Sequence, residues 1–368
     1  MKILIIGGSN SLLKDGYVTH LAQSLQGYVE PEIVQISVGA TTSLSAIGRL
    51  YETYASTSVA PVDVVLYEYS INDTGHFAPR PGGADSWLFC FHLLLKTAAQ
   101  LYPTAVFVPL VLAQQQHFSS TAPHPIYDAQ LRAFNELALP VIDVRAALSA
   151  LFLGRAPAWL YRDPAHYDTP HATSIVGAIV AQRLLTLKAQ NAEPLAATAA
   201  RLQAVSPFAG LQAMYLPGVN LQQFTSGPVQ RGHTGNRLMQ LDYLRMLPGS
   251  RLELNSEMFP LALFLKSDPQ HDALQLELGS DDGLAFNARV ATRHADTETL
   301  PFVYSSIPLP LLWSHSLLRP YGASRLAVSV PEQAGGAQTG FDCYAGGRPD
   351  APERHLDLVG VLMLTEAR

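Results

Sequence analysis

Cysteine and long apolar runs are scarce in this sequence of 368 residues. The two cysteines, Cys90 and Cys343, form no Cys-x-x-Cys pair, which argues against a disulfide framework and against a cysteine metal site. No apolar run approaches the roughly 18–20 residues that cross a bilayer, and the N-terminal run of about five residues is shorter than a secretory signal requires. We therefore expect no membrane span and no signal peptide, and we expect the protein in the cytoplasm.

Basic residues are in deficit, since 24 Lys and Arg stand against 30 Asp and Glu for a formal net charge of −6. Nucleic acid and anionic membranes are therefore not expected as partners. The Gly7-Gly8 pair lacks the third glycine of a dinucleotide fingerprint, and no Gly-Lys-Ser or Gly-Lys-Thr follows it. The histidines at positions 76, 92, 117 and 124 have no tight ligand spacing, so we predict no metal and no cofactor.

Residues 1 to 190 alternate between strand-like apolar runs and helical patterns, which is typical of a parallel sheet covered by helices. The expected strands are Lys2–Ile6, Glu32–Ile36, Val62–Tyr67, Ala105–Leu112 and Pro140–Val144. The expected helices are Gly16–Leu25, Ser43–Tyr54, Asp85–Leu101 and Thr173–Ala189. This half is predicted to be a doubly wound α/β domain with a mainly parallel sheet.

The pattern changes after an Ala-rich stretch, and we expect a linker over residues 191–204. Residues 205–368 alternate apolar and polar positions and contain turn pairs such as Pro217-Gly218 and Asp282-Gly283, which predicts a β-sandwich-like accessory domain. Its aromatic residues and its Pro and Gly content suit a carbohydrate-binding sandwich. A packing or dimerisation module fits them equally, which leaves a homo-oligomer open.

The N-terminus carries the first candidate for chemistry. The apolar run Lys2–Ile6 opens into Gly7-Gly8-Ser9, and paired glycines allow a sharp turn after a buried strand. Ligands bind at the carboxyl edge of open α/β sheets, so a serine presented there is a candidate nucleophile. The alternative interpretation of Ser9 is that its hydroxyl only caps the turn.

Two further residues follow expected strands at the same edge. Asn72 lies just past Val62–Tyr67, and an amide side chain there can donate to an oxyanion. Gly39 follows Glu32–Ile36 and can offer its backbone N–H while leaving room for a substrate. The backbone N–H of Ser9 can be the third donor. As an alternative, an Asn-Asp pair after a strand often does no more than form a turn.

A serine nucleophile needs a base and a carboxylate that orients the base, and the sequence offers two Asp-x-x-His pairs. Asp163 and His166 form the first pair, and Asp168 and His171 form the second. We favour Asp168 and His171, because the expected helix Thr173–Ala189 follows at the distance suited to a histidine at its entrance. His166 would need a longer intervening loop, but the alternative stays open.

The order of Gly-Gly-Ser9, Gly39, Ile-Asn72-Asp and Asp-x-x-His171 resembles the SGNH/GDSL hydrolase superfamily over residues 1 to about 190. Enzymes of that superfamily are esterases, lipases, carbohydrate acetylesterases or acyltransferases. The resemblance implies a catalytic triad and an oxyanion hole, with Ser9 as nucleophile, His171 as base, Asp168 as its orienting partner, and Gly39 and Asn72 as oxyanion donors.

Two positions depart from the usual pattern of the superfamily. Gly8 stands where aspartate is usual, and Ser70 stands where glycine is usual, which bears on the substrate class more than on the nucleophile. We expect a serine esterase that hydrolyses O-acyl esters, in particular O-acetyl esters, of a carbohydrate or an acylated small molecule. A glycan O-acyltransferase with the same nucleophile is the nearest alternative. A non-catalytic glycan-binding protein is the alternative from another class.

Overall fold

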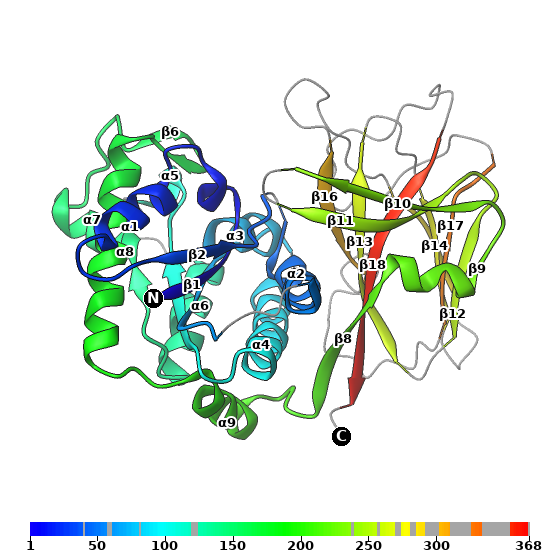
Figure 1. Ribbon diagram of the computed structural model, residues 1–368, viewed down its shortest axis with the longest axis horizontal. Coiled ribbons are helices and arrows are strands. Elements are labelled where there is room, and N and C mark those ends of the chain that lie inside the picture. The colour runs from blue at the N-terminus through cyan, green and yellow to red at the C-terminus, as the bar shows by residue number, and fades with distance from the viewer. Residues whose placement is uncertain are drawn as a thin grey trace. The chain divides into compact units, whose positions relative to one another are not determined.

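The structure is a computed structural model that describes residues 1–39, 41–56, 61–80, 82–118, 124–236, 239–255, 258–268, 274–279, 285–290, 302–309, 325–332 and 354–366. The chain divides into two compact units, Met1–Ala209 and Gly210–Arg368 (Figure 1). Cys343 and the expected turn pair Asp282-Gly283 lie outside the described residues.

The first unit contains a five-stranded parallel sheet in the order β2-β1-β3-β4-β5. The predicted α/β domain with a mainly parallel sheet is therefore confirmed. The strands are β1 (Lys2–Gly7), β2 (Glu32–Gln35), β3 (Val64–Glu68), β4 (Val106–Val111) and β5 (Ile142–Asp143), and a separate two-stranded sheet pairs β6 (Tyr161–Asp163) with β7 (His166–Tyr167). The helices are α1 (Tyr17–Leu25), α2 (Ser43–Ser56), α3 (Ser70–Phe77), α4 (Gly83–Leu101), α5 (Gln115–Phe118), α6 (Pro125–Glu136), α7 (Val144–Leu151), α8 (His171–Ala189) and α9 (Leu195–Val205), with the 3₁₀ turn η1 (Ser9–Leu12).

Helices cover both faces of the parallel sheet, with α1 and α8 on one side and α2 and α4 on the other (Figure 1). Strand side chains alternate between the two faces, so Ile3 and Ile5 of β1 join the buried cluster that contains residues of α1 and α8. On the other face, the ring of Tyr67 in β3 lies 5.7 Å from that of Phe91 in α4 and 6.5 Å from that of Phe134 in α6. The sheet is thus buried on both faces, as its apolar strands require.

The stretch expected as a linker over residues 191–204 is instead largely the helix α9, which packs on the first unit. Leu195 and Leu202 are completely buried, and the backbone N–H of Leu195 donates to the carbonyl of Ala105 at 2.7 Å. Alanine and leucine are strong helix formers, and the two leucines are spaced to lie on one helix face. The unit therefore extends to Ala209 rather than ending near residue 190.

The second unit is built from two antiparallel sheets, which confirms the predicted β-sandwich-like class. One sheet has the order β10-β11-β18-β13-β16, with β8 also pairing with β18, and the other has the order β15-β14-β17-β12-β9. Leucines of both sheets form one buried cluster, for example Leu252 and Leu263. The elements are β8 (Leu211–Pro217), η2 (Gly218–Phe224), β9 (Thr225–Ser226), β10 (Val229–Gly235), β11 (Gln240–Met246), β12 (Arg251–Asn255), β13 (Phe259–Ser267), β14 (Leu274–Gly279), β15 (Ala285–Val290), β16 (Val303–Pro308), β17 (Arg325–Ser329) and β18 (Leu356–Glu366).

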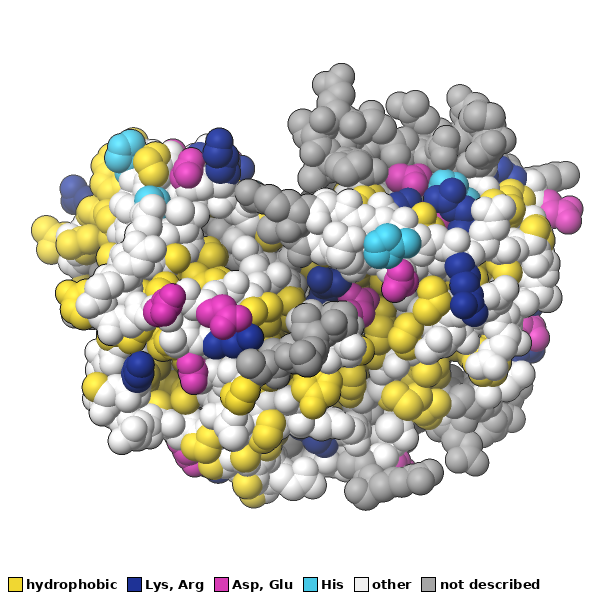
Figure 2. Space-filling view, viewed as in Figure 1, with side chains coloured by type: hydrophobic (Ala, Val, Ile, Leu, Met, Phe, Trp, Pro, Cys, Tyr) yellow, Lys and Arg dark blue, Asp and Glu magenta, His cyan; other side chains and the backbone are white. Residues whose placement is uncertain are grey.

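Charged side chains on the face drawn in Figure 2 are of both signs and lie interspersed over the described residues. Among the described residues on this face, the Lys and Arg side chains form no continuous basic surface. In the described part of the chain, no helix combines the length and the apolar character needed to cross a membrane.

Candidate functional site

Ser9 lies at the carboxyl edge of the parallel sheet, as the sequence predicts. Strand β1 ends at Gly7, which pairs with Glu68 at the end of β3, and η1 begins at Ser9. The turn is fixed to β3, because the backbone N–H of Gly8 donates to the carbonyl oxygen of Glu68 at 2.9 Å and the Ser11 hydroxyl donates to Oε2 of Glu68 at 2.8 Å. The hydroxyl of Ser9 is therefore carried by a well-anchored turn.

Glu68 is a buried carboxyl group directly beneath this turn that the sequence reasoning missed. Burial raises its pKa to about 8, although the hydrogen bonds from Ser11 and from the N–H of Gly8 act in the opposite direction. The side chain is fully buried, and within the described residues its Oε1 has no hydrogen-bond partner. The only signal in the sequence is a carboxylate that ends the apolar run Val64–Glu68.

Gly39 lies beside Ser9. The backbone N–H of Val38 donates to the carbonyl of Gly7 at 2.8 Å, which brings the segment after β2 against the end of β1. A Cβ atom at position 39 would lie 3.4 Å from Cβ of Ser9. The structure therefore places the backbone of Gly39 next to the candidate nucleophile.

Asn72 lies in the first turn of α3, directly after β3, and its side chain packs against Gly8. A Cβ atom at position 8 would lie 2.0 Å from Oδ1 of Asn72, and the residue is only 7 % exposed. Its neighbour Asp73 accepts a hydrogen bond from the N–H of Ser43 at 2.9 Å, which ties the start of α2 to α3. Burial raises the pKa of Asp73 to about 6 against the effect of hydrogen bonds from Ser43 and Tyr67.

The histidine that meets Ser9 is His166. Its Nε2 lies 2.7 Å from Oγ of Ser9, and its Nδ1 lies 2.9 Å from each carboxylate oxygen of Asp163. With the proton on Nδ1, the ring donates to Asp163 and accepts from the Ser9 hydroxyl. The three side chains thus form one continuous hydrogen-bonded chain in the order serine, imidazole, carboxylate.

Asp163 is held by the backbone of the turn between β6 and β7. Its Oδ1 accepts hydrogen bonds from the N–H groups of Ala165 and His166, each at 2.9 Å. Partial burial by itself would raise the pKa of Asp163, but these hydrogen bonds and the His166 ring outweigh it and lower the pKa. The carboxylate is therefore kept ionised and aimed at the histidine.

The favoured pair Asp168 and His171 is not brought to Ser9. His171 is the first residue of α8, its side chain is 76 % exposed, and its Nδ1 lies 3.5 Å from Oδ2 of Asp168. His166 reaches Ser9 from the tight β6–β7 hairpin, with Nε2 2.7 Å from Oγ of Ser9. The pair that the structure brings to Ser9 is thus His166 and Asp163, which we left as the alternative.

No family model matches the sequence, and no curated protein matches it. Among solved structures, a two-domain esterase active on acetylated mannans matches 100 % of this chain and 92 % of its own, with 13 % identity and a TM-score of 0.61, as does its structure co-crystallised with mannopentaose. A GDSL-like lipase from Parabacteroides merdae matches 51 % of this chain and 95 % of its own, with 16 % identity and a TM-score of 0.41.

The chain has the fold of a two-domain esterase. The match to the mannan esterase covers both units, so it confirms the expectation that a hydrolase-like α/β domain is joined to an appended β domain.

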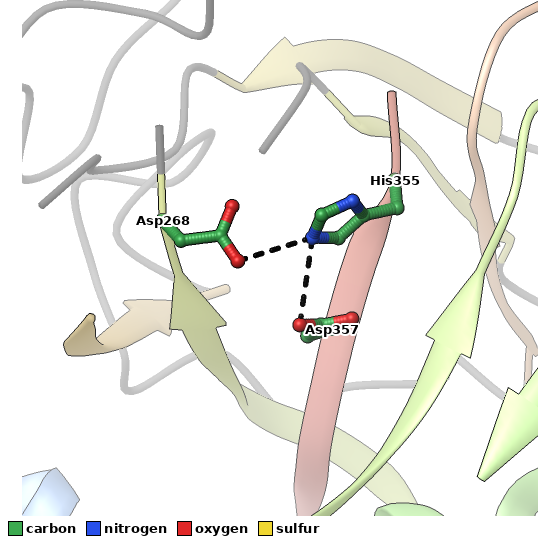
Figure 3. A group of neighbouring side chains, drawn as sticks. All are labelled: Asp268, His355 and Asp357. Carbon is green, nitrogen blue, oxygen red and sulfur yellow. Dashed lines mark hydrogen bonds and ion pairs between the residues drawn. The ribbon is translucent and has the colours of Figure 1, made fainter. Parts of the chain in front are cut away.

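The β domain of this esterase fold contains a second cluster of titratable groups, where the ring of His355 faces the carboxylates of Asp268 and Asp357 (Figure 3). His355 Nε2 lies 3.2 Å from Asp268 and 3.5 Å from Asp357. Nζ of Lys266 lies 2.7 Å from Oδ2 of Asp268 and 2.7 Å from Oδ2 of Asp357. Arg245 donates to the two carboxylate oxygens of Asp357, from Nε at 2.8 Å and from Nη2 at 2.9 Å.

The carboxylates of this cluster are already neutralised by its basic side chains. Burial alone would lower the pKa of His355, but the hydrogen bonds that its ring donates to the carboxylates of Asp268 and Asp357 outweigh it and raise the pKa to about 9. Three basic side chains therefore surround two carboxylates, and a metal ion would have to displace them. The arrangement fits an ion network that joins β11, β13 and β18 better than it fits a metal site.

Proposed function

We propose that this protein is a serine esterase whose catalytic triad is Ser9, His166 and Asp163. The observation that carries the proposal is the 2.7 Å contact between Oγ of Ser9 and Nε2 of His166, with Nδ1 of the same ring on the carboxylate of Asp163. A serine activated by an oriented base is the arrangement that acyl transfer requires.

In the proposed reaction, His166 takes the hydroxyl proton of Ser9 as Oγ attacks the ester carbonyl carbon. The resulting tetrahedral oxyanion is bound by the backbone N–H groups of Ser9 and Gly39 and by the Asn72 amide. When it collapses, the bond from carbon to the alkoxy oxygen breaks, and His166 gives its proton to the leaving alcohol. Water then attacks the acyl carbon and loses a proton to His166. The bond from that carbon to Oγ of Ser9 breaks, Oγ takes the proton back from His166, and the free acid leaves.

We propose an O-acetyl ester of a carbohydrate as the substrate. The support is the fold shared over both units with an esterase that is described as active on acetylated mannans. Gly39 adds no side chain next to Ser9, which leaves room for an acyl group at the nucleophile.

The β domain is proposed to bind the glycan chain. A cavity of about 550 Å³ lies beside η2, and its volume is within the range of small-ligand sites. Phe224, which is 46 % exposed, lines it together with Arg231, whose Nε donates to Gln222 at 2.8 Å. The apolar lining residues Leu216, Leu254, Met258 and Met363 combine with the amides Asn220, Gln223 and Asn255. An aromatic and apolar surface edged by amides is suited to a sugar ring and its hydroxyl groups.

The test is the intact mass of the protein after exposure to a fluorophosphonate probe, for wild type and for Ser9→Ala, His166→Ala and His171→Ala. We expect one adduct in the wild type and in His171→Ala, and none in the other two variants. Loss of labelling in His171→Ala with labelling kept in His166→Ala would contradict the proposed base. An unlabelled wild type that still binds an oligosaccharide would favour the non-catalytic glycan-binding alternative.

Hydrolysis is separated from transfer by product analysis with an acetylated oligosaccharide and a free sugar acceptor. We expect free acetate as the product. Acetylated acceptor would instead identify a glycan O-acyltransferase that uses the same nucleophile.

A further inference from the structure

Asn10, the residue after Ser9, joins the serine turn to the hairpin that carries His166. Its Nδ2 donates to the carbonyl of Ala165 at 2.9 Å, and its Oδ1 accepts from the N–H of Tyr167 at 3.2 Å. The side chain is 2 % exposed. Both backbone partners are direct neighbours of His166, one on each side.

A carboxamide holds a donor and an acceptor in one plane, so two such bonds fix both the distance and the orientation of the segment between them. The hairpin needs this support, because it pairs only Tyr161 with Tyr167 and Asp163 with His166, and it has an irregularity between the two pairs. A two-stranded hairpin alone is marginally stable in water.

We propose that Asn10 is a positioning residue that sets the separation and alignment of Ser9 and His166. This inference rests on the proposed esterase function of the same site. Asn10 acts through the backbone on either side of the base and contacts no reacting atom, so it governs how often the Ser9–His166 hydrogen bond has reactive geometry. Asn10 and Ser9 are adjacent in one turn, so the Asn10 carboxamide ties the backbone on either side of the base directly to the turn that carries the nucleophile.

The chemistry of the carboxamide explains why asparagine stands at position 10. Aspartate could still accept from Tyr167, but it would place a carboxylate oxygen against the carbonyl of Ala165 and remove the donor. Alanine would leave the partly buried carbonyl of Ala165 and the buried N–H of Tyr167 without this partner. The hairpin has a second anchor, the hydrogen bond from the N–H of Gln115 to the carbonyl of Pro164 at 2.9 Å, so it is expected to stay folded in both variants.

The experiment compares Asn10→Ala and Asn10→Asp with wild type, using p-nitrophenyl acetate for kcat and KM and the fluorophosphonate probe for the labelling rate. Misplacement of a catalytic group by about 1 Å can cost on the order of 10²-fold, so we expect kcat of Asn10→Ala to fall by about that factor. KM should change little, because Asn10 does not touch the substrate.

The pH profile gives a readout that a merely structural role would not move. An added carboxylate near His166 favours the imidazolium form, so the acidic limb of kcat/KM should shift to higher pH in Asn10→Asp. Asn10→Ala adds no charge. Its kcat should fall relative to wild type, but the acidic limb of its kcat/KM profile should not shift to higher pH.

Thr173→Val is the matched control. Thr173 is also 2 % exposed, and its hydroxyl donates to the carbonyls of Asp15 at 2.9 Å and Pro170 at 3.2 Å, so it ties the segment after η1 to the entrance of α8. The variant removes a buried side-chain link of the same kind without touching the hairpin. We expect a drop in thermal midpoint comparable to that of Asn10→Ala, with kcat and the labelling rate of wild type.

Some results would overturn the role of Asn10 and leave the proposed esterase function standing. One is a wild type that is labelled by the probe while its Asn10→Ala variant keeps full kcat. Another is a Thr173→Val variant that loses as much kcat as Asn10→Ala. A wild type that takes up no probe and hydrolyses no ester would overturn the proposed function itself, and the role of Asn10 with it. Wild-type kcat and an unshifted pH profile in Asn10→Asp would also contradict the proposal.

Discussion

The carboxamide of Asn72 occupies the space that a side chain at position 8 would need, since a Cβ atom on Gly8 would lie 2.0 Å from its Oδ1. This relationship gives a physical reason for the glycine at a position where the SGNH/GDSL resemblance leads one to expect aspartate. The carboxylate nearest to this position belongs instead to Glu68, whose Oε2 lies 3.2 Å from the backbone nitrogen of Gly8.

Gly8→Ala is therefore expected to displace Asn72. A separation of 2.0 Å is far inside van der Waals contact, so the Asn72 side chain has to move, which would take its amide away from the proposed oxyanion position. We expect kcat to fall on the order of 10²-fold, because the loss of one oxyanion donor costs about that much. The measurement is kcat with p-nitrophenyl acetate, and Gly210→Ala, where no atom lies within 4 Å of the new Cβ, is the control.

Asn72→Ala tests the oxyanion role directly. Removing the donor should lower kcat by about 10²–10³-fold with a smaller change in KM, since the hydrogen bond strengthens in the transition state. Steady-state kinetics give both constants, with the exposed Asn135→Ala of α6 as the control. Unchanged turnover in Asn72→Ala would remove this residue from the site.

Glu68→Gln should change the pH dependence of stability. The folded-state pKa of Glu68, about 8, lies above its ordinary value of 4.5, so its favourable contribution is fully present below pH 4.5 and is lost as the pH rises through 8. Glutamine does not ionise. The free energy of unfolding of the variant minus that of wild type should therefore rise between pH 4.5 and 8 and stay constant above pH 8. Urea unfolding at a series of pH values measures this, with the exposed Glu136→Gln as control. If the stability of the variant relative to wild type falls toward pH 8, the raised pKa of Glu68 in the folded protein is contradicted.

Phe224→Ala tests the glycan site proposed beside η2. In a Ser9→Ala background, which removes turnover, loss of the aromatic surface should weaken binding to mannan about tenfold, equivalent to about 1.4 kcal/mol. Affinity electrophoresis with mannan in the gel provides the measurement. Tyr28→Ala is a matched control, because Tyr28 is a 75 % exposed aromatic residue of the first unit. Equal retardation of the Phe224→Ala and control proteins would place glycan binding elsewhere.

Much of the site follows from the sequence because regular strands leave a readable pattern. Buried parallel strands appear as apolar runs, and Ser9, Gly39 and Asn72 each follow such a run, so their meeting at one edge can be predicted. The base could not be chosen in the same way. Strand β7 has only two residues, His166 and Tyr167, which is too short for any periodicity, and both Asp-x-x-His pairs have the same spacing.

Tertiary contacts account for the other differences. Glu68 ends an apolar strand, and nothing local indicates that it lies beneath the turn of Ser9. The Ala-rich stretch near residue 195 stands where the α/β pattern gives way to the β pattern, so it is expected to be a linker when its partner surface is unknown. The role of Leu195 and Leu202 is seen only in the folded structure, where both are buried as α9 packs on the first unit.

The hydrogen bond between Ser9 and His166 joins residues that are 157 positions apart in the chain. Contacts of such long sequence separation form only after a large loop has closed, and they are slow to form during folding. Enzymatic activity regained after dilution from denaturant should therefore trail the recovery of helical circular dichroism, and reactivity toward the probe would mark the moment at which the two ends of the α/β unit come together.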